Sequence, residues 1–154
     1  MQTDPSYYWT DDDLLAGYEA VLAPEAVTYR PIGRVRVEHK GPTAHASPAD
    51  RESRIVLDPD VADGLNGVTA GDRLTVVFHL DRSRRGPMVQ HPRGDASRPK
   101  RGVFALRTPR RPNPIGITVV EVLGIEGCEV RVKGLDALDG TPVLDLKPMM
   151  EDEL

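Results

Sequence analysis

Cysteine is almost absent from this chain, because Cys128 is the only one among 154 residues. A secreted fold held together by disulfides needs paired cysteines, so that class is excluded. The first residues, MQTDPSYYWTDDD, contain neither the basic start nor the apolar segment of a secretory signal. We therefore expect a cytoplasmic protein, in which Cys128 lies in a strand and belongs to the core rather than to a nucleophilic site.

Long apolar runs are also missing, and none approaches the roughly 20 residues of a membrane-spanning helix. The length of the chain and its 39% of hydrophobic residues suit one globular domain with an ordinary core. The first 26 residues carry six acids and no Lys or Arg. We expect residues 1–26 to form an acidic extension, helical or flexible, and residues 27–154 to form the domain.

Helical patterns are scarce: only two helices are expected, at residues 12–22 and from about Pro59. No G-x-G-x-x-G or Walker motif follows any strand, which argues against a Rossmann nucleotide fold. Alternating or β-branched runs dominate instead. The expected strands are Ile32–Glu38, Arg54–Leu57, Arg73–Leu80, Val103–Leu106, Ile117–Leu123, Glu129–Lys133 and Val143–Leu146. Strands without crossover helices predict an all-β fold, a small and mainly antiparallel barrel of about seven strands.

Acids are nearly missing from one segment, although the formal net charge of the chain is −4. Between Asp81 and Arg111 there are ten Lys and Arg against two Asp, a local excess of about eight positive charges. Such a segment on an acidic protein indicates either a local anion site or a solvated loop. Its first part, residues 82–100, is rich in Arg, Pro and Gly and predicts a long loop.

The stretch RTPRRPNPIG, residues 107–116, connects two predicted strands. Its three prolines fix their own φ angles and push the residues before them into extended conformations, so the loop should be stiff. Prolines donate no backbone hydrogen bond, and the stretch therefore presents fixed carbonyl acceptors. Gly116 permits a positive φ or the close approach of a ligand to the backbone. A structural connection and a ligand-binding wall both remain open on these grounds.

A second motif, GLDALDGTPVLDLKP, covers residues 134–148. Asp139-Gly140 between two apolar runs is a strong signal for the tight turn of a hairpin. The turn does not explain the density of acids, since Asp136 and Asp145 lie within the same stretch. Carboxylates here suit ribose hydroxyls, an ammonium or an adenine amine. The residues alone leave the turn and the binding site equally supported.

The two motifs together, RGVFALRTPRRPNPIGITVV followed by GLDALDGTPVLDLKP, resemble the TsaA/TrmO-like family of S-adenosylmethionine-dependent tRNA methyltransferases. The resemblance covers about Pro31 to Pro148, and PIGRV, GLNGVTAGDRLTVVFHL and HPRGD also match the short form of that family. It implies a small β-barrel and a homodimer with S-adenosylmethionine bound near the subunit interface. It further implies methylation of N6 of the threonylcarbamoyl-modified adenine immediately 3′ of the anticodon.

The resemblance also assigns roles to residues of this chain. The implied cofactor-binding residues are Arg107, Pro109, Arg111, Asn113, Ile115, Gly116, Asp136, Leu138 and Asp139. Arg107 suits the cofactor carboxylate, and Asp139 suits its ammonium or hydroxyls. The proton of N6 has three unranked acceptors, Asp136, Asp139 and His79. The residues expected to contact tRNA are Arg84, Arg85, Arg93, Arg98, Lys100, Arg101 and Arg110. No metal is expected, because the four histidines show no ligand spacing.

Two other functions stay open at this point. One is methyl transfer to another nucleobase or to a small molecule, and the other is an RNA-binding barrel without catalysis. Binding of S-adenosylmethionine distinguishes a cofactor-dependent protein from a plain RNA-binding barrel.

Overall fold

The computed structural model describes residues 26–37 and 47–150 of the chain. The helix expected at residues 12–22 lies outside this part. The described residues divide between two compact units, a smaller one with residues 26–28 and 82–115 and a larger one with residues 29–37, 47–81 and 116–150. The boundary predicted after residue 26 stays a prediction, and each unit is described separately below. Among the described residues, no helix is long and apolar enough to span a membrane.

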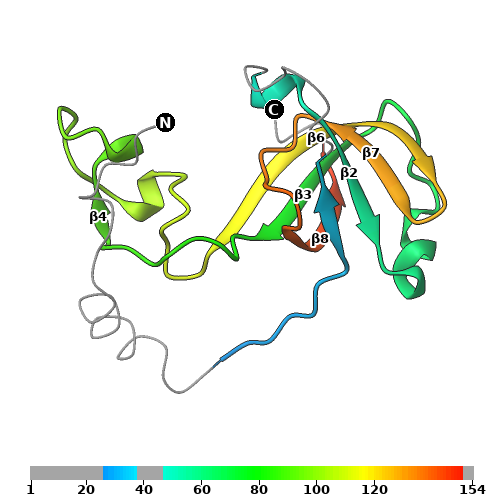
Figure 1. Ribbon diagram of the computed structural model, residues 1–154, viewed down its shortest axis with the longest axis horizontal. Helices are drawn as coiled ribbons and strands as arrows, with labels where there is room; N and C mark the ends of the chain where they lie inside the picture. The colour runs from blue at the N-terminus through cyan, green and yellow to red at the C-terminus, as the bar shows by residue number, and fades with distance from the viewer. Residues whose placement is uncertain (1–25, 38–46, 151–154) are drawn as a thin grey trace. The chain divides into compact units, whose positions relative to one another are not determined.

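The larger unit is a closed antiparallel barrel with the strand order β1-β2-β7-β6-β3-β8. Its curved strands are visible in Figure 1. The strands are β1 (Gly33–Arg36), β2 (Glu52–Leu57), β3 (Arg73–His79), β6 (Ile115–Glu126), β7 (Glu129–Lys133) and β8 (Pro142–Pro148). Two 3-10 helices accompany them, η3 (Pro48–Asp50) and η4 (Pro59–Leu65). The predicted all-β barrel class is therefore confirmed, and the short helix expected from Pro59 is η4.

The barrel core consists mainly of valines that alternate with outward residues. β2 follows the pattern exposed, buried, half-buried, buried, and β3 and β7 alternate in the same way. Val35, Ile55, Val76, Val130 and Val143 are all 0% exposed. Each such side chain contributes roughly 1.5–3 kcal/mol through its burial, which compensates for the scarcity of aromatic residues.

The smaller unit has little regular structure. It contains the two-residue strands β4 (Val89–Gln90) and β5 (Arg101–Gly102), which pair with each other, and the 3-10 helices η5 (Pro92–Gly94) and η6 (Val103–Ala105). The strand predicted at Val103–Leu106 is wrong, because η6 occupies it. Only Val103 of this run is buried, and its amide donates to the Met88 carbonyl at 2.9 Å. The apolar run thus anchors one turn instead of forming a strand.

Two further expectations are corrected. The motif of residues 134–148 is not a hairpin, because β7 pairs with β2 and β6 whereas β8 pairs with β1 and β3. The segment between them is a connection that crosses from one barrel position to another. Cys128 lies in the turn before β7 rather than in a strand, and it is half-buried. Its carbonyl accepts from the Leu57 amide at 2.9 Å, so the turn is fixed to β2.

Candidate functional site

The proline-arginine loop, residues 107–116, is held from within the smaller unit by the side chain of Gln90. The Gln90 amide nitrogen donates to the carbonyls of Pro87 at 2.7 Å and Arg110 at 2.8 Å. Its amide oxygen accepts from the Thr108 hydroxyl at 3.1 Å. The half-buried Gln90 side chain therefore uses both its amide N–H donors and its amide oxygen. It supplies the loop with a hydrogen-bond donor, which the prolines lack. Nothing in the local sequence around Gln90 signals this role.

Arg111 stabilises the same loop. Its guanidinium donates from Nη1 to the carbonyls of Leu106 at 2.7 Å and Thr108 at 3.2 Å. These are carbonyls of the kind that a proline-rich connection leaves without backbone donors. Charge-assisted hydrogen bonds are stronger than neutral ones, so Arg111 fixes the conformation of the loop. Its contact with a cofactor stays a prediction.

Arg107 differs from Arg111 in its surroundings. The residue is exposed, and no hydrogen bond or ion pair holds its guanidinium within residues 26–37 and 47–150. Pro109, Asn113 and Ile115 are exposed on the same loop. The braced loop thus presents one arginine with its donors available to a ligand, and commits another to its own backbone.

Gly116 begins the part of β6 that belongs to the barrel, and its lack of a side chain has a packing reason. A Cβ placed on it would overlap the Phe78 ring, reaching 2.6 Å from Cζ and 3.0 Å from Cδ2. Phe78 is 3% exposed and belongs to the barrel core. The backbone of Gly116 does not have a positive φ, so packing against the ring explains this glycine without the special conformation considered above.

The acidic turn of residues 138–141 attaches to β1. The Thr141 amide donates to the Leu138 carbonyl at 3.2 Å, and Gly140 has a φ of 82°, which confirms the tight turn. The Gly140 amide donates to the Val35 carbonyl at 2.7 Å. Asp139 Oδ1 accepts from the Val37 amide at 2.9 Å. Asp139 therefore has a structural task, since one of its oxygens anchors the turn to the edge of β1.

The other candidates of the barrel unit are less engaged. Asp136 and Leu138 are exposed, and Leu138 keeps 59% of its surface accessible. His79 is half-buried at the end of β3. No hydrogen bond joins His79 to Asp136 within the described residues, so the structure does not bring the acid-base candidates into one hydrogen-bonded group.

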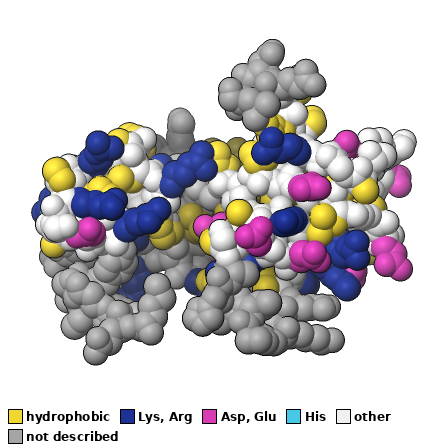
Figure 2. Space-filling view, turned by 90° about the horizontal axis from the view of Figure 1, so that it is seen from above, with side chains coloured by type: hydrophobic (Ala, Val, Ile, Leu, Met, Phe, Trp, Pro, Cys, Tyr) yellow, Lys and Arg dark blue, Asp and Glu magenta, His cyan; other side chains and the backbone are white. Residues whose placement is uncertain are grey.

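The arginines and the lysine predicted to contact tRNA all lie in the smaller unit. Exposed cations include Arg93, Arg98, Lys100 and Arg101, and most of the charged side chains visible on this unit in Figure 2 are basic. Arg93 has a φ of 55°, which is unusual for a residue with a side chain.

The region around Arg98 also contains Asp95, the single acid among the described residues of this unit. Asp95 forms an ion pair with Arg98 at 3.3 Å, and hydrogen bonds from Ser97 lower the pKa of its carboxyl. This acid therefore stays charged among the basic side chains, and it orders the turn that carries Arg98.

The two phenylalanines of the chain, Phe78 and Phe104, have opposite environments. Phe78 is buried in the barrel, so it is not available for stacking on a base. Phe104 in η6 is 80% exposed, beside the buried Val103 that anchors its turn. Exposure of a large aromatic on a basic unit is the arrangement that unpaired bases use for stacking. Their burial alone separates the two residues.

The nine predicted cofactor residues are shared between the units. Five belong to the proline-arginine loop of the smaller unit, ending at Ile115, and Gly116 and the acidic turn belong to the barrel. The grooves of about 880 and 680 Å³ on the barrel are lined by other residues. Among the described residues, no cluster of three His, Cys, Asp or Glu is arranged to hold a metal ion.

Comparisons with known proteins agree with these motifs. A family model described as the tRNA-methyltransferase O N-terminal domain matches residues 36–153. A protein of Archaeoglobus fulgidus named "Probable S-adenosyl-L-methionine-binding protein" is 42% identical over 125 residues, which are 79% of this chain and 34% of that protein. A mouse protein named "tRNA (adenine(37)-N6)-methyltransferase" is 48% identical over 64 residues, which are 42% of this chain and 14% of its length.

A solved structure supports the same relationship. The crystal structure of TrmO from Pseudomonas aeruginosa superimposes with a TM-score of 0.62 and 29% identity, covering 82% of this chain and 57% of that one. The chain thus spans about a third of the Archaeoglobus relative and just over half of the Pseudomonas structure. Because the family model covers most of the sequence, the chain belongs to the family of the tRNA-methyltransferase O N-terminal domain.

Proposed function

We propose that this protein is an S-adenosylmethionine-dependent tRNA methyltransferase that acts on N6 of an adenine. The observation that carries the proposal is the exposed, unengaged Arg107 on a loop that Gln90 and Arg111 hold rigid, within a chain of this family. The names of the Archaeoglobus and mouse relatives supply the cofactor and the adenine. Within this proposal, the acceptor is the threonylcarbamoyl-modified adenine immediately 3′ of the anticodon.

The described residues fit such a cofactor by their chemistry. Arg107 offers guanidinium donors for a carboxylate, and the exposed carboxylates of Asp136 and Asp139 offer acceptors for an ammonium or ribose hydroxyls. S-adenosylmethionine, when bound, supplies an electrophilic methyl group on its sulfonium. The protein's task is then to hold N6 in line with that methyl, and the stiff loop suits positioning of this kind. Asp136, Asp139 or His79 accepts the N6 proton.

The smaller unit then binds the tRNA. Its exposed cations suit phosphates, and the 80% exposed Phe104 offers a ring to an unpaired base. If about four cations contact phosphates, the logarithm of tRNA affinity falls with the logarithm of salt with a slope near −3. We further propose a cytoplasmic homodimer, for which sedimentation with and without the cofactor is the measurement.

The decisive experiment is incubation with labelled S-adenosylmethionine and tRNA that carries or lacks the threonylcarbamoyl group. Label in the modified tRNA alone supports the full proposal, and label in both tRNAs supports N6 transfer without that preference. Absence of label from either tRNA contradicts the methyltransferase. If calorimetry still detects S-adenosylmethionine in that case, another acceptor or a non-catalytic role replaces it.

A pair of arginine variants tests the site itself. Arg107→Ala should weaken cofactor binding by about 1.5–3 kcal/mol, the range for a hydrogen bond to a charged group. Arg107→Lys should restore part of the affinity, because the charge remains. Arg111→Ala is the comparison variant: it removes two carbonyl contacts of the loop and should raise the exchange rate of the loop amides, which Arg107→Ala should leave unchanged. Unchanged affinity in Arg107→Ala would remove this residue from the cofactor site.

A further inference from the structure

Three arginines lie directly opposite one another on neighbouring strands of the barrel. Arg36 of β1 is the register partner of Arg54 of β2, and Arg54 is the register partner of Arg131 of β7. All three alternate with buried residues, so their side chains belong to the outer face. We call Arg36, Arg54 and Arg131 the arginine row. Like charges directly opposite one another destabilise a sheet, so the presence of three arginines at these positions requires an explanation.

Opposite charges pair on one side of the row, whereas Glu126 stands opposite Glu129 on the other side. On one side of the row, Lys133 stands opposite Glu52 and Glu121, and it also forms an ion pair with Asp50 at 3.6 Å. Opposite charges therefore face each other there. Among the residues that the structure describes, only the middle arginine of the row has a carboxylate partner, since Arg54 pairs with Glu129 at 3.2 Å. Arg36 and Arg131 are exposed, and no hydrogen bond or ion pair engages their guanidinium groups within the described residues.

The surface around the row is concave. Arg36 and Arg54 line the groove of about 880 Å³, together with Arg30 and Arg34. Arg54 and Arg131 line a second groove, of about 200 Å³. The two grooves share Arg54, so they adjoin along the row.

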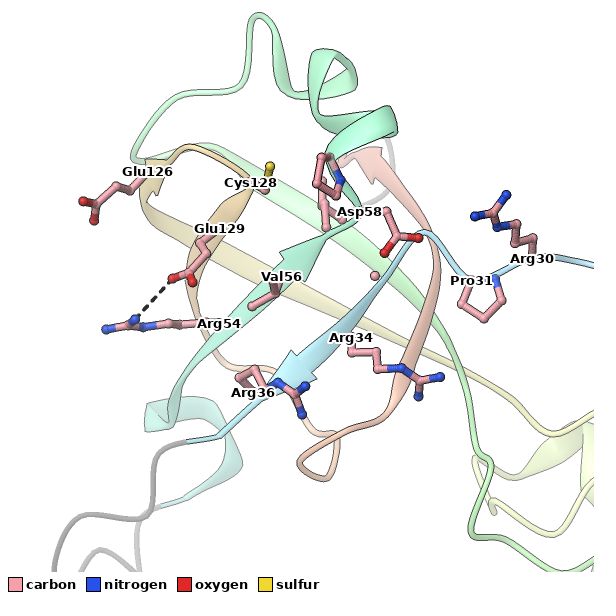
Figure 3. Close-up of a pocket in the computed structure, with 13 residues that line it drawn as sticks. Arg30, Pro31, Arg34, Arg36, Arg54, Val56, Asp58, Glu126, Cys128 and Glu129 are labelled. Atoms are coloured by element: carbon pink, nitrogen blue, oxygen red, sulfur yellow. Dashed lines mark hydrogen bonds and ion pairs between the residues drawn. The ribbon is translucent and has the colours of Figure 1, made fainter.

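Figure 3 shows Arg34 and Arg36 extending from β1 and Arg54 reaching Glu129. At the end of the row, Arg131 faces Gly124, whose missing side chain leaves the guanidinium uncovered. The carboxylates of Glu126 and Glu129 also line both grooves, and that of Asp58 lines the larger one, so the surface holds five arginines against three acids.

The spacing of the row indicates the type of anion. Adjacent strands lie about 4.8 Å apart, so the row extends over about 10 Å between its outer members. Arginine side chains are long enough to converge on one phosphate or to contact successive phosphates of one strand. The two grooves that adjoin along the row favour the extended ligand. Arginine is also the side chain that matches phosphate oxygens in pairs.

We propose that the arginine row is a second binding surface for the phosphate backbone of the RNA substrate, on the barrel and separate from the basic smaller unit. That the polyanion is RNA rests on the proposed function. The row gives the substrate a second point of attachment, which fixes its register and not its sequence. The outer arginines, Arg36 and Arg131, carry most of the binding, because Arg54 is already paired.

The test uses the full chain and unmodified tRNA, with affinity measured at several salt concentrations. Arg36→Gln and Arg131→Gln should each reduce the magnitude of the log-log salt slope by about 0.7, and the double variant by about 1.4. Each single change should weaken tRNA binding roughly two- to fivefold, the size of an exposed charge pair. Arg36→Lys should retain the slope, since it keeps the charge. The matched control is Arg73→Gln, an exposed arginine of β3 outside the row, which should leave the slope unchanged.

Three further measurements separate this proposal from its neighbours. The melting temperature of Arg36→Gln should not fall, because the change relieves repulsion, and S-adenosylmethionine affinity should stay constant. Equal slopes in the wild type and in the double variant would overturn the proposal even if the protein methylates tRNA. A reduced slope would sustain it even if no methyl transfer occurs. Saturable binding of inorganic phosphate that disappears in Arg36→Gln would show a single-anion site instead and also overturn it.

Discussion

Replacement of Gly116 by alanine tests why the motif ends on glycine. The added Cβ would lie 2.6 Å from Cζ of Phe78, a residue of the barrel core that is only 3% exposed. Forcing an extra methyl into a packed core costs about 1–3 kcal/mol. Gly116→Ala should therefore lower the free energy of unfolding by that amount, measured by urea denaturation.

A double-variant cycle identifies the cause. Phe78→Leu removes the ring edge that the added methyl would meet. In that background, Gly116→Ala should lower the free energy of unfolding by less than about 0.5 kcal/mol. Alanine also has less backbone entropy to lose in a strand than glycine. The coupling between the two sites should then be at least about 0.5 kcal/mol. An equal penalty in both backgrounds would refute the packing argument. A loss of S-adenosylmethionine affinity that persists in the double variant would show that a ligand needs the space.

The remaining predictions concern the residues that hold the two motifs. Gln90→Leu removes all three side-chain hydrogen bonds of Gln90, each worth about 0.5–1.5 kcal/mol, so amides of the proline-arginine loop should exchange faster while barrel amides do not. Asp139→Ala should destabilise the protein by about 1 kcal/mol, because the Val37 amide loses its acceptor. Asp139→Asn keeps an acceptor and should affect only cofactor affinity. Equal unfolding curves for the two variants would contradict this structural role of Asp139. The Asp95 carboxyl should show a pKa below 3.8 in an NMR pH titration. Its contribution to folding stability is present above that pH and is lost as the pH falls through the lowered pKa. Ser97→Ala should raise this pKa, because it removes the hydroxyl donor.

The β-class of the fold follows from local patterns. The runs around Ile55, Val76 and Val130 alternate because one face of each strand is buried, and alternation is a property that adjacent residues reveal. The strand predicted from the run at Val103 was wrong because this alternation is missing there. It is apolar without alternation, and its Val103 amide bonds to Met88 rather than to a strand partner. Apolar content alone therefore did not distinguish a strand from an anchored turn.

The sequence did not predict which strands pair with each other when they are distant along the chain. The Asp139-Gly140 turn is encoded locally, because only certain residues tolerate its φ of 82° at Gly140, yet the strands on either side of it pair with other strands. The choice of strand partner depends on closure of the whole barrel. The arginine row illustrates this, since Arg36, Arg54 and Arg131 are distant in sequence and meet only through strand register.

The sequence by itself determined the β-barrel class, the family through RTPRRPNPIG and LDGTPV, and the clustering of positive charge in residues 82–111. Backbone preferences, alternation and charge are local quantities, so neighbouring residues suffice to express them. Only the tertiary structure decided that Arg111 braces its own loop while Arg107 stays exposed, and that Gly116 makes room for Phe78. Those roles depend on which groups meet in space, and residues of one type become different once their neighbours are fixed.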